Sequence, residues 1–266
     1  MYFKKRICPK CGDTHDELLD YCPKCKSKNE DDIEIKRHFA VTFLNPSYEI
    51  FLIVLGLAGF TLFDFIFALI FRNIYIANNL HGLMLINVAS YLVFFIFILF
   101  VFFRFLKAFL DKFKDYWSYL YGIIGAVVLA LGTIIINLIF NLIYPHSGDN
   151  VNQTALVNIC KMYPAISIIV FGIIGPICEE FVYRVGLFSF LKRIHPALAY
   201  AGTALIFGLI HIDFGASDMV LEIIALPTYI WGGLCLSFIY EIRGVAASCT
   251  SHILNNVYSF IMILVS

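Results

Sequence analysis

The chain has 266 residues, of which 61% are hydrophobic and 14% are charged, whereas roughly a quarter of the residues are charged in soluble domains. This composition excludes an ordinary soluble domain and predicts a membrane protein. The formal net charge of zero gives no support to nucleic-acid binding. However, 17 of the 38 charged residues lie among the first 40, so a small polar domain is expected to precede the membrane domain.

The first 28 residues contain two Cys-Pro-Lys-Cys knuckles, Cys8 with Cys11 and Cys22 with Cys25. Two such knuckles supply four thiolates to one tetrahedral zinc ion, and a site with four protein ligands is structural. Two disulfides are the alternative, and they would require an oxidising compartment. We therefore predict a zinc ribbon over residues 1–28 that holds a structural Zn²⁺ and offers a surface for a cytosolic partner.

Residues 29–47 are polar and predict a solvated linker. The apolar runs that follow are suited to a bilayer, which a helix of about 20 residues crosses. We predict an all-α polytopic membrane protein with about seven or eight transmembrane helices, divided into an N-terminal group over 48–144 and a second region over 145–266. An eighth crossing would lie in the third run or between 145 and 164. The seven runs lie near 48–71, 83–103, 117–143, 165–190, 197–212, 219–240 and 245–265.

Basic residues beside the spans predict the orientation, because cytosolic loops carry an excess of Lys and Arg. A cytosolic N-terminus leaves only Arg72 and Lys161 on the opposite side. It also keeps the ribbon thiols in a reducing compartment. The basic residues assigned to the cytosolic side are Arg104, Lys107, Lys112, Lys114, Lys192, Arg193 and Arg243.

The fourth span contains adjacent carboxylates, Glu179 and Glu180, followed by Arg184. Positions i and i+4 share a helix face, so Glu180 and Arg184 are expected to pair. Glu179 then lacks a cation and is free to point into a cavity as a general acid or base. The alternative is that both glutamates belong to a buried ion network without catalytic work.

Two further apolar segments carry polar residues at helical spacing. Phe207 and His211 end the fifth span, and His252 and Asn256 share one face of the last span. A single histidine on an apolar helix is usually a packing residue, but here two histidines, two glutamates and an amide fall in neighbouring spans. We expect them to converge on one hydrated pocket. In contrast, Asp213, Asp218 and Glu222 are expected to be solvated at the outer end of the fifth and sixth spans.

The order of these motifs resembles the CPBP (Abi) family of intramembrane proteases, which includes the type II CAAX prenyl endopeptidases. The resemblance covers about residues 145–265, and the zinc ribbon lies outside it. The motifs are EExxxR at Glu179, Glu180 and Arg184, FxxxH at Phe207 and His211, and HxxxN at His252 and Asn256.

The resemblance implies hydrolysis of a peptide bond within the membrane, in a bacterial plasma membrane, with the lipid bilayer and a membrane-associated peptide as partners. Glu179 would activate a water molecule with the help of His211. His252 and Asn256 would stabilise the oxyanion, while Glu180 and Arg184 would hold the site in shape.

Several alternatives remain open at this stage. Two histidines and a carboxylate could bind a catalytic zinc ion, but no helical HExxH motif is present, and we favour a metal-free glutamic mechanism. The substrate could be a prenylated CAAX tail, a peptide pheromone or a bacteriocin. A non-catalytic scaffold, a bacteriocin self-immunity protein and a proton-coupled transporter are the other functions compatible with these residues.

Overall fold

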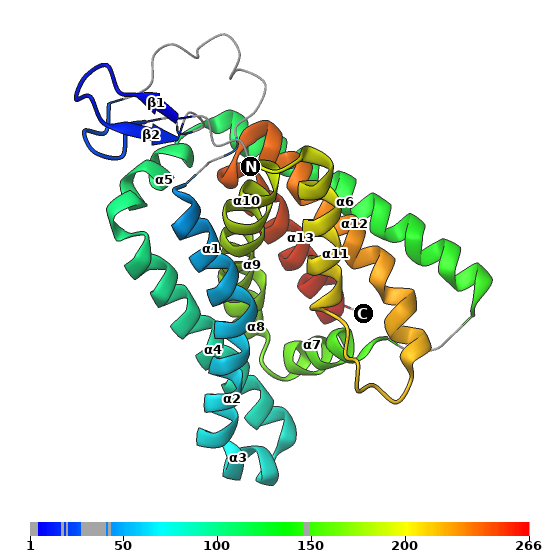
Figure 1. Ribbon diagram of the computed structural model, residues 1–266. Helices are drawn as coiled ribbons and strands as arrows, with labels where there is room; N and C mark the ends of the chain where they lie inside the picture. The colour runs from blue at the N-terminus through cyan, green and yellow to red at the C-terminus, as the bar shows by residue number, and fades with distance from the viewer. Residues whose placement is uncertain are drawn as a thin grey trace.

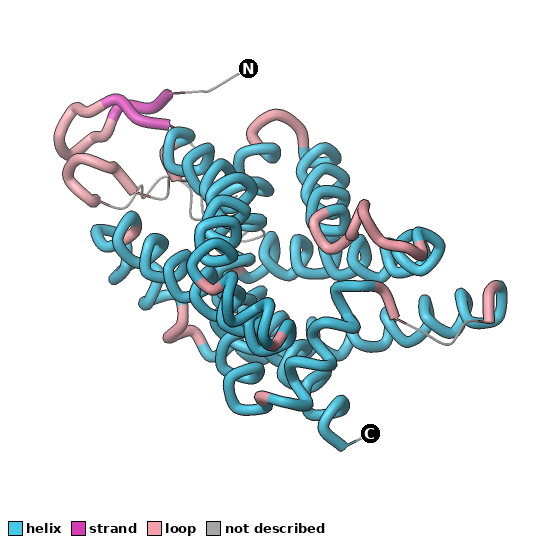
Figure 2. The backbone as a smooth tube through the Cα atoms, turned by 90° about the horizontal axis from the view of Figure 1, so that it is seen from below, coloured by secondary structure: helices cyan, strands magenta, loops and turns pink. Residues whose placement is uncertain are grey.

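The computed structural model describes residues 5–16, 19, 21–27, 41, 44–145 and 149–265. Within these residues, two short antiparallel strands precede a chain that is almost entirely helix and short loops (Figures 1 and 2). Most of the predicted linker, residues 29–40 and 42–43, lies outside the described part. The elements of the N-terminal half are β1 (Lys5–Ile7), β2 (Thr14–Asp16), α1 (Pro46–Val54), η3 (Leu55–Gly59), α2 (Phe60–Ile70), α3 (Arg72–Ala77), α4 (Asn79–Val101), η4 (Phe103–Phe105), α5 (Leu106–Lys112) and α6 (Tyr116–Ile143).

The C-terminal half contains the three segments in which the polar motifs were found. The motif EExxxR lies at the junction of α9 and η6, FxxxH at the end of α11, and HxxxN in α13. The elements of this half are α7 (Val151–Met162), α8 (Pro164–Ile169), η5 (Val170–Ile174), α9 (Gly175–Glu180), η6 (Phe181–Phe188), α10 (Ser189–Lys192), α11 (Pro196–Leu209), α12 (Met219–Arg243) and α13 (Val245–Val265).

The described chain has six helical segments long and apolar enough to cross a membrane, together with one shorter apolar helix, α11. The predicted all-α membrane fold is therefore confirmed, and the protein is an integral membrane protein. Each of the seven predicted runs corresponds to one of these helices. The stretch between 145 and 164 contains α7, which is not among the membrane-spanning candidates. The six segments are Pro46–Ile70, Asn79–Val101, Tyr116–Ile143, Pro164–Lys192, Met219–Arg243 and Val245–Val265.

The six segments differ in how much of each is covered by protein. More than half of the most apolar window of Pro164–Lys192 is buried, whereas the corresponding windows of the other five are mostly exposed. The exposed side chains on those helices are largely aliphatic and aromatic, as expected for surfaces that contact lipid. The segment with the two adjacent glutamates is thus the central helix of the bundle.

Small residues allow α6 to approach α13 closely. Gly122 and Gly125 are buried on the same face of α6. A Cβ atom at Gly122 would lie 2.5 Å from the Thr250 side chain, and one at Gly125 would lie 2.3 Å from the Ser251 hydroxyl. The Ser251 hydroxyl donates a hydrogen bond of 2.8 Å to the Gly122 carbonyl. This contact fixes the helix face next to His252, since small residues let membrane helices pack backbone to backbone.

The central helix changes its winding on both sides of α9. The segments η5 and η6 are π-helical, and the Gly175 N–H bonds to the Val170 carbonyl. Pro176 follows directly. A proline removes one backbone donor and crowds the carbonyl four residues before it, and a π turn placed just before it gives that carbonyl more room. Such π segments often accompany functional sites.

A buried ion pair joins the start of the first membrane segment to the end of the fourth. Glu49 lies in α1 and Arg193 directly follows α10, and their side chains are 0% and 1% exposed. The Arg193 Nε and Nη2 atoms donate to the two Glu49 oxygens at 2.9 and 3.0 Å. The Leu44 backbone N–H donates to the same carboxylate at 3.0 Å. Both carboxylate oxygens are thereby occupied at the end of the bundle where β1 and β2 also lie (Figure 1).

Candidate active site and metal centre

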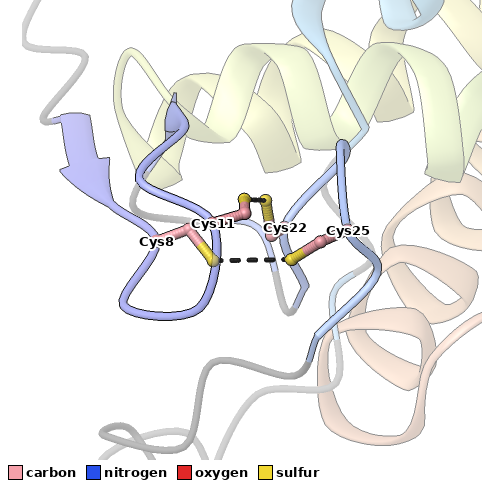
Figure 3. A group of neighbouring side chains, drawn as sticks. All are labelled: Cys8, Cys11, Cys22 and Cys25. Carbon is pink, nitrogen blue, oxygen red and sulfur yellow. Dashed lines mark hydrogen bonds between the residues drawn. The ribbon is translucent and has the colours of Figure 1, made fainter.

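Four sulfur atoms meet in the N-terminal ribbon. The Cys8 and Cys25 sulfurs are 3.6 Å apart and the Cys11 and Cys22 sulfurs 3.5 Å apart (Figure 3). All four thiols are free and lie within 4.8 Å of one another. Sulfurs bound tetrahedrally to one zinc ion would be about 3.8 Å apart. The predicted ligand set is therefore brought together with spacing that fits a single metal ion.

The two knuckles have the same type of backbone turn. In the first, the Gly12 N–H donates to the Cys8 carbonyl, and in the second the Lys26 N–H donates to the Cys22 carbonyl, at 2.9 and 2.8 Å. The turn requires a positive φ at its fifth residue, which is 71° at Gly12 and 58° at Lys26. Glycine adopts this conformation readily, whereas a residue with a Cβ atom does so at a cost.

A hydroxyl group supports the thiolate form of two of these cysteines. The Ser27 Oγ lies 3.4 Å from the Cys8 sulfur and 3.0 Å from the Cys25 sulfur. Hydrogen bonding from Ser27 lowers the pKa of Cys8 to about 6 and also lowers the pKa of Cys25. Since the thiolate is the metal-binding form, these hydrogen bonds favour the ligand form of Cys8 and Cys25.

A cavity of about 1020 Å³ lies inside the helical bundle. Four of the six predicted active-site residues, Glu179, His211, His252 and Asn256, line it. They come from α9, the turn after α11, and α13. The other two predicted residues, Glu180 and Arg184, do not line the cavity, and both of their side chains are 0% exposed.

Of the two adjacent glutamates, Glu179 is the one that lines this cavity, and its side chain is 18% exposed. The Tyr91 hydroxyl from α4 donates a hydrogen bond of 3.3 Å to its Oε1. The His252 Nε2 lies 3.7 Å from its Oε2. The two oxygens of Glu179 therefore face a tyrosine hydroxyl and an imidazole, not an arginine or a lysine.

Glu180 belongs to a different environment one residue away. Its Oε1 lies 3.4 Å from the Arg184 Nη1 and 2.9 Å from the His252 Nδ1. The Arg184 guanidinium also lies over the Phe207 ring, 4.8 Å from its centroid. The predicted i, i+4 pair of Glu180 and Arg184 is present, and the pair supports the imidazole that faces Glu179.

The hydrogen bonds of the two histidines indicate which ring nitrogen carries the hydrogen in the neutral form. The His211 Nδ1 lies 2.7 Å from the Phe207 carbonyl, which only accepts, so this nitrogen carries the hydrogen. The same reasoning applies to His252, whose Nδ1 meets the Glu180 carboxylate. In their neutral forms both rings therefore present an accepting Nε2. His252 donates from Nε2 only when it is protonated.

Asn256 has a hydrogen to offer. Its Nδ2 donates to the Phe171 carbonyl at 3.2 Å. A side-chain amide nitrogen carries two hydrogens, so one of them remains beyond the bond to Phe171. Because Asn256 lines the cavity, this N–H is a candidate donor toward a bound carbonyl oxygen.

The expectation that Glu222 is solvated was wrong, because its side chain is completely buried. Its Oε1 accepts from the Val151 N–H at 2.8 Å, and its Oε2 accepts from the Asp213 N–H at 3.1 Å and from the Asn150 amide at 3.4 Å. Glu222 thus ties α12 to the start of α7 and to the loop after α11. Sequence spacing does not reveal this role, since Val151 and Asn150 lie 71 and 72 residues before Glu222.

The same network supports His211. The Asn150 amide nitrogen donates to the His211 carbonyl at 3.4 Å. The Tyr229 ring stacks on the His211 ring with a centroid distance of 4.4 Å and an interplanar angle of 15°. The Tyr229 hydroxyl donates to the Asn150 side-chain oxygen at 3.4 Å. Sequence reasoning missed Tyr91, Asn150 and Tyr229, which do not form motifs with the residues they contact.

Among the described residues, two groups of side chains have the spacing of metal ligands. Each group contains at least three Cys, His, Asp or Glu side chains, and its ligand atoms lie within 4.8 Å of one another. Both groups are in the ribbon. They are the four cysteines and a second, overlapping group of Asp13, His15 and Cys22. In the described structure, the donor atoms of Glu179, His211 and His252 are thus more widely spread than the ribbon sulfurs.

Comparisons with known proteins agree with the motifs. Residues 161–258 match the family model described as type II CAAX prenyl endopeptidase Rce1-like. An uncharacterized protein of Mycoplasma capricolum subsp. capricolum (strain California kid) is 28% identical over a match of 149 residues, and the match covers 53% of this chain. The chain spans 42% of the length of that relative. No solved structure matches significantly.

The matched region contains the residues of all three motifs, with α9, η6, α11 and the part of α13 up to Tyr258. It excludes the ribbon, α1–α6 and Tyr91. The family is one of intramembrane CAAX-type proteases and implies peptidase activity at the family level. The resemblance noted in the motifs is confirmed, because residues 161–258 match the Rce1-like model of the type II CAAX prenyl endopeptidases.

Proposed function

We propose that this protein is an intramembrane endopeptidase that hydrolyses a peptide bond of a membrane-associated or lipid-modified peptide, with Glu179 as the general base. The observation that carries the proposal is the environment of Glu179. It is a partly exposed carboxylate on a cavity within the bundle, with an imidazole beside one oxygen and no arginine or lysine among the residues that line that cavity. An acidic side chain in such a place is expected to have a function.

The reaction begins with a water molecule between Glu179 and the accepting Nε2 of His211. Glu179 takes one proton from the water, and the oxygen of the resulting hydroxide attacks the carbonyl carbon of the scissile bond. The C–N bond of the tetrahedral intermediate then breaks. The proton held by Glu179 passes to the leaving nitrogen, so that an amine and a carboxylic acid are formed and Glu179 returns to its starting state.

The oxyanion of the intermediate needs hydrogen-bond donors. The second N–H of Asn256 serves as one donor. His252 serves as another when it is protonated, because its Nδ1 hydrogen is bonded to Glu180 and the added hydrogen lies on Nε2. Glu180 and Arg184 orient this ring from behind and do not contact the substrate.

The ribbon holds a structural Zn²⁺ and faces the cytosol of a bacterial cell, with the helices in the plasma membrane. The substrate reaches the cavity from the bilayer. A prenylated CAAX tail and a peptide pheromone or bacteriocin precursor are the two substrate classes to compare.

The decisive experiment uses the full chain in proteoliposomes with membrane peptides of both classes, and mass spectrometry to detect new termini. Replacing Glu179 by Gln should lower the rate roughly 100- to 10,000-fold, as expected for loss of a general base. Glu241→Gln is the matched control, because Glu241 is a carboxylate that pairs with Lys192 and does not line the cavity. Full activity of Glu179→Gln would refute the proposal.

The metal-free mechanism is tested with the Cys22→Ser variant, in which the ribbon should no longer retain zinc. We expect this protein to contain no stoichiometric zinc and to hydrolyse peptide at an unchanged rate after treatment with a chelator. One zinc ion per chain that persists in this variant, with activity lost on its removal, would instead support a metalloprotease.

A further inference from the structure

We propose that Tyr91 is a positioning residue for the reaction, which holds one oxygen of Glu179 so that the other is directed to the water molecule. This proposal rests on the function proposed above. Tyr91 belongs to α4 and lies outside the region that matches the family model. The active site would then be completed by a helix from the N-terminal half of the chain.

The contact involves a specific oxygen atom. The Tyr91 hydroxyl donates to Glu179 Oε1 at 3.3 Å, while Oε2 is the oxygen near the His252 Nε2. A carboxylate that is held at one oxygen can no longer turn freely about its terminal bond. Its second oxygen therefore keeps one direction toward the cavity, as general-base catalysis requires.

Packing fixes the direction of the Tyr91 hydroxyl. The Phe60 ring meets the Tyr91 ring at a centroid distance of 4.8 Å, and the Phe171 ring meets it at 5.8 Å, both edge to face. A Cβ atom at Gly175 would lie 3.2 Å from the Tyr91 ring, so the glycine one turn before Glu179 leaves the space that this ring occupies. The ring is thus held by three surrounding groups, and the hydroxyl is held by its own hydrogen bond.

A neutral donor suits this task better than a cation. Glu180, which is next in the chain, is paired with Arg184 and is fully buried. The same pairing at Glu179 would stabilise the charged carboxylate and weaken it as a proton acceptor. A tyrosine hydroxyl orients the carboxylate with one hydrogen bond and adds no positive charge to the cavity.

The test compares two substitutions that each remove one tyrosine hydroxyl. Tyr91→Phe keeps the ring between Phe60 and Phe171. The matched control is Tyr163→Phe, because the Tyr163 hydroxyl is bonded to His81 at 2.7 Å and neither residue lines the main cavity. Steady-state kinetics in proteoliposomes should show that Tyr91→Phe lowers kcat roughly 10- to 100-fold with KM changed less than about twofold, while the control changes neither constant.

A double variant separates an effect through Glu179 from a general loss of structure. In the Glu179→Gln protein, adding Tyr91→Phe should lower the residual rate by less than about twofold, because the two residues act as a unit. An unchanged kcat in Tyr91→Phe would overturn the proposal, and so would an equal loss in Tyr163→Phe. A full additional loss in the double variant would also overturn it.

Infrared spectroscopy distinguishes failure of this proposal from failure of the proposed function. The band of the Glu179 carboxyl group is the one that disappears in Glu179→Gln, and Tyr91→Phe should shift it while Tyr163→Phe does not. A shift without any peptide hydrolysis by the wild type would refute both the peptidase activity and a catalytic use of Tyr91, leaving only a structural contact. Hydrolysis without a shift would refute Tyr91 alone.

Discussion

The end of the bundle beside β1 and β2 and the cavity in its interior both contain carboxylates, but these carboxylates differ in their hydrogen bonding. At the ribbon end, Glu49 has both oxygens bonded by Arg193 and one of them also by a backbone N–H. In the cavity, Glu179 has a hydroxyl at one oxygen and an imidazole at a longer distance from the other. Saturated hydrogen bonding fits a structural role for Glu49, whereas Glu179, which is partly exposed and incompletely bonded, is the carboxylate that we expect to transfer a proton.

This comparison predicts the largest loss of stability at Glu49. Glu49→Ala should lower the free energy of unfolding by about 3–5 kcal/mol, because it leaves the Arg193 charge buried without its partner. Thermal unfolding in detergent measures the effect. Replacing both residues, by Glu49→Leu with Arg193→Met, should recover most of the loss. A single variant as stable as the wild type would contradict the structural role.

Glu222 is a second saturated carboxylate, but its partners are neutral. Glu222→Ala should lower the free energy of unfolding by about 2–3 kcal/mol, since the Val151 and Asp213 N–H groups lose their acceptor. Glu222→Gln retains one of the two accepting oxygens and should cost less. The two variants are compared by thermal unfolding in the same detergent, and equal stability of Glu222→Ala and the wild type would show that these N–H groups find other partners.

The ribbon offers a substitution that should stabilise. Lys26 has the positive φ that Gly12 has in the other knuckle, so Lys26→Gly should favour the metal-bound ribbon by about 1 kcal/mol. Competition with a chromogenic zinc chelator measures this as a several-fold tighter affinity. Gly12→Lys should have the opposite sign, and weaker binding by both variants would contradict a shared turn geometry.

Glu179→Gln is expected to have the smallest effect on stability, although it is proposed to have the largest effect on activity. Glu179→Gln should change the free energy of unfolding by less than about 1 kcal/mol, because it removes no saturated network and the amide can still accept from Tyr91. Thermal unfolding and peptide hydrolysis measured on the same preparation test this. A loss as large as that of Glu49→Ala would show that Glu179 is also a structural carboxylate.

Much of the architecture was predictable because it depends on local patterns. Apolar runs of bilayer length located the membrane helices, and the i, i+4 spacing predicted the pair of Glu180 and Arg184. The paired cysteine knuckles likewise predicted their own cluster. Each of these signals depends on residues that are near one another in the sequence or repeat a known spacing.

Contacts between distant segments were not predictable in this way. Tyr91 is one of 15 tyrosines in an aromatic-rich chain, and only the packing of α4 against α9 brings it to Glu179, 88 residues away. Glu222 was expected to be solvated, because the Val151 N–H that it accepts from is 71 residues earlier in the chain. Sequence spacing defines which residues share a helix face, while the tertiary packing decides what that face meets.

The imidazole of His252 also marks the position of α13 along its neighbours. One nitrogen lies 2.9 Å from Glu180 and the other 3.7 Å from Glu179. Apolar helix faces in lipid discriminate poorly between alternative alignments, and a displacement by one turn is only about 5.4 Å. A ring that contacts two adjacent side chains at once would lose both contacts after such a shift. This histidine therefore fixes the register of the last helix, and with it the position of the Asn256 amide along the helix axis.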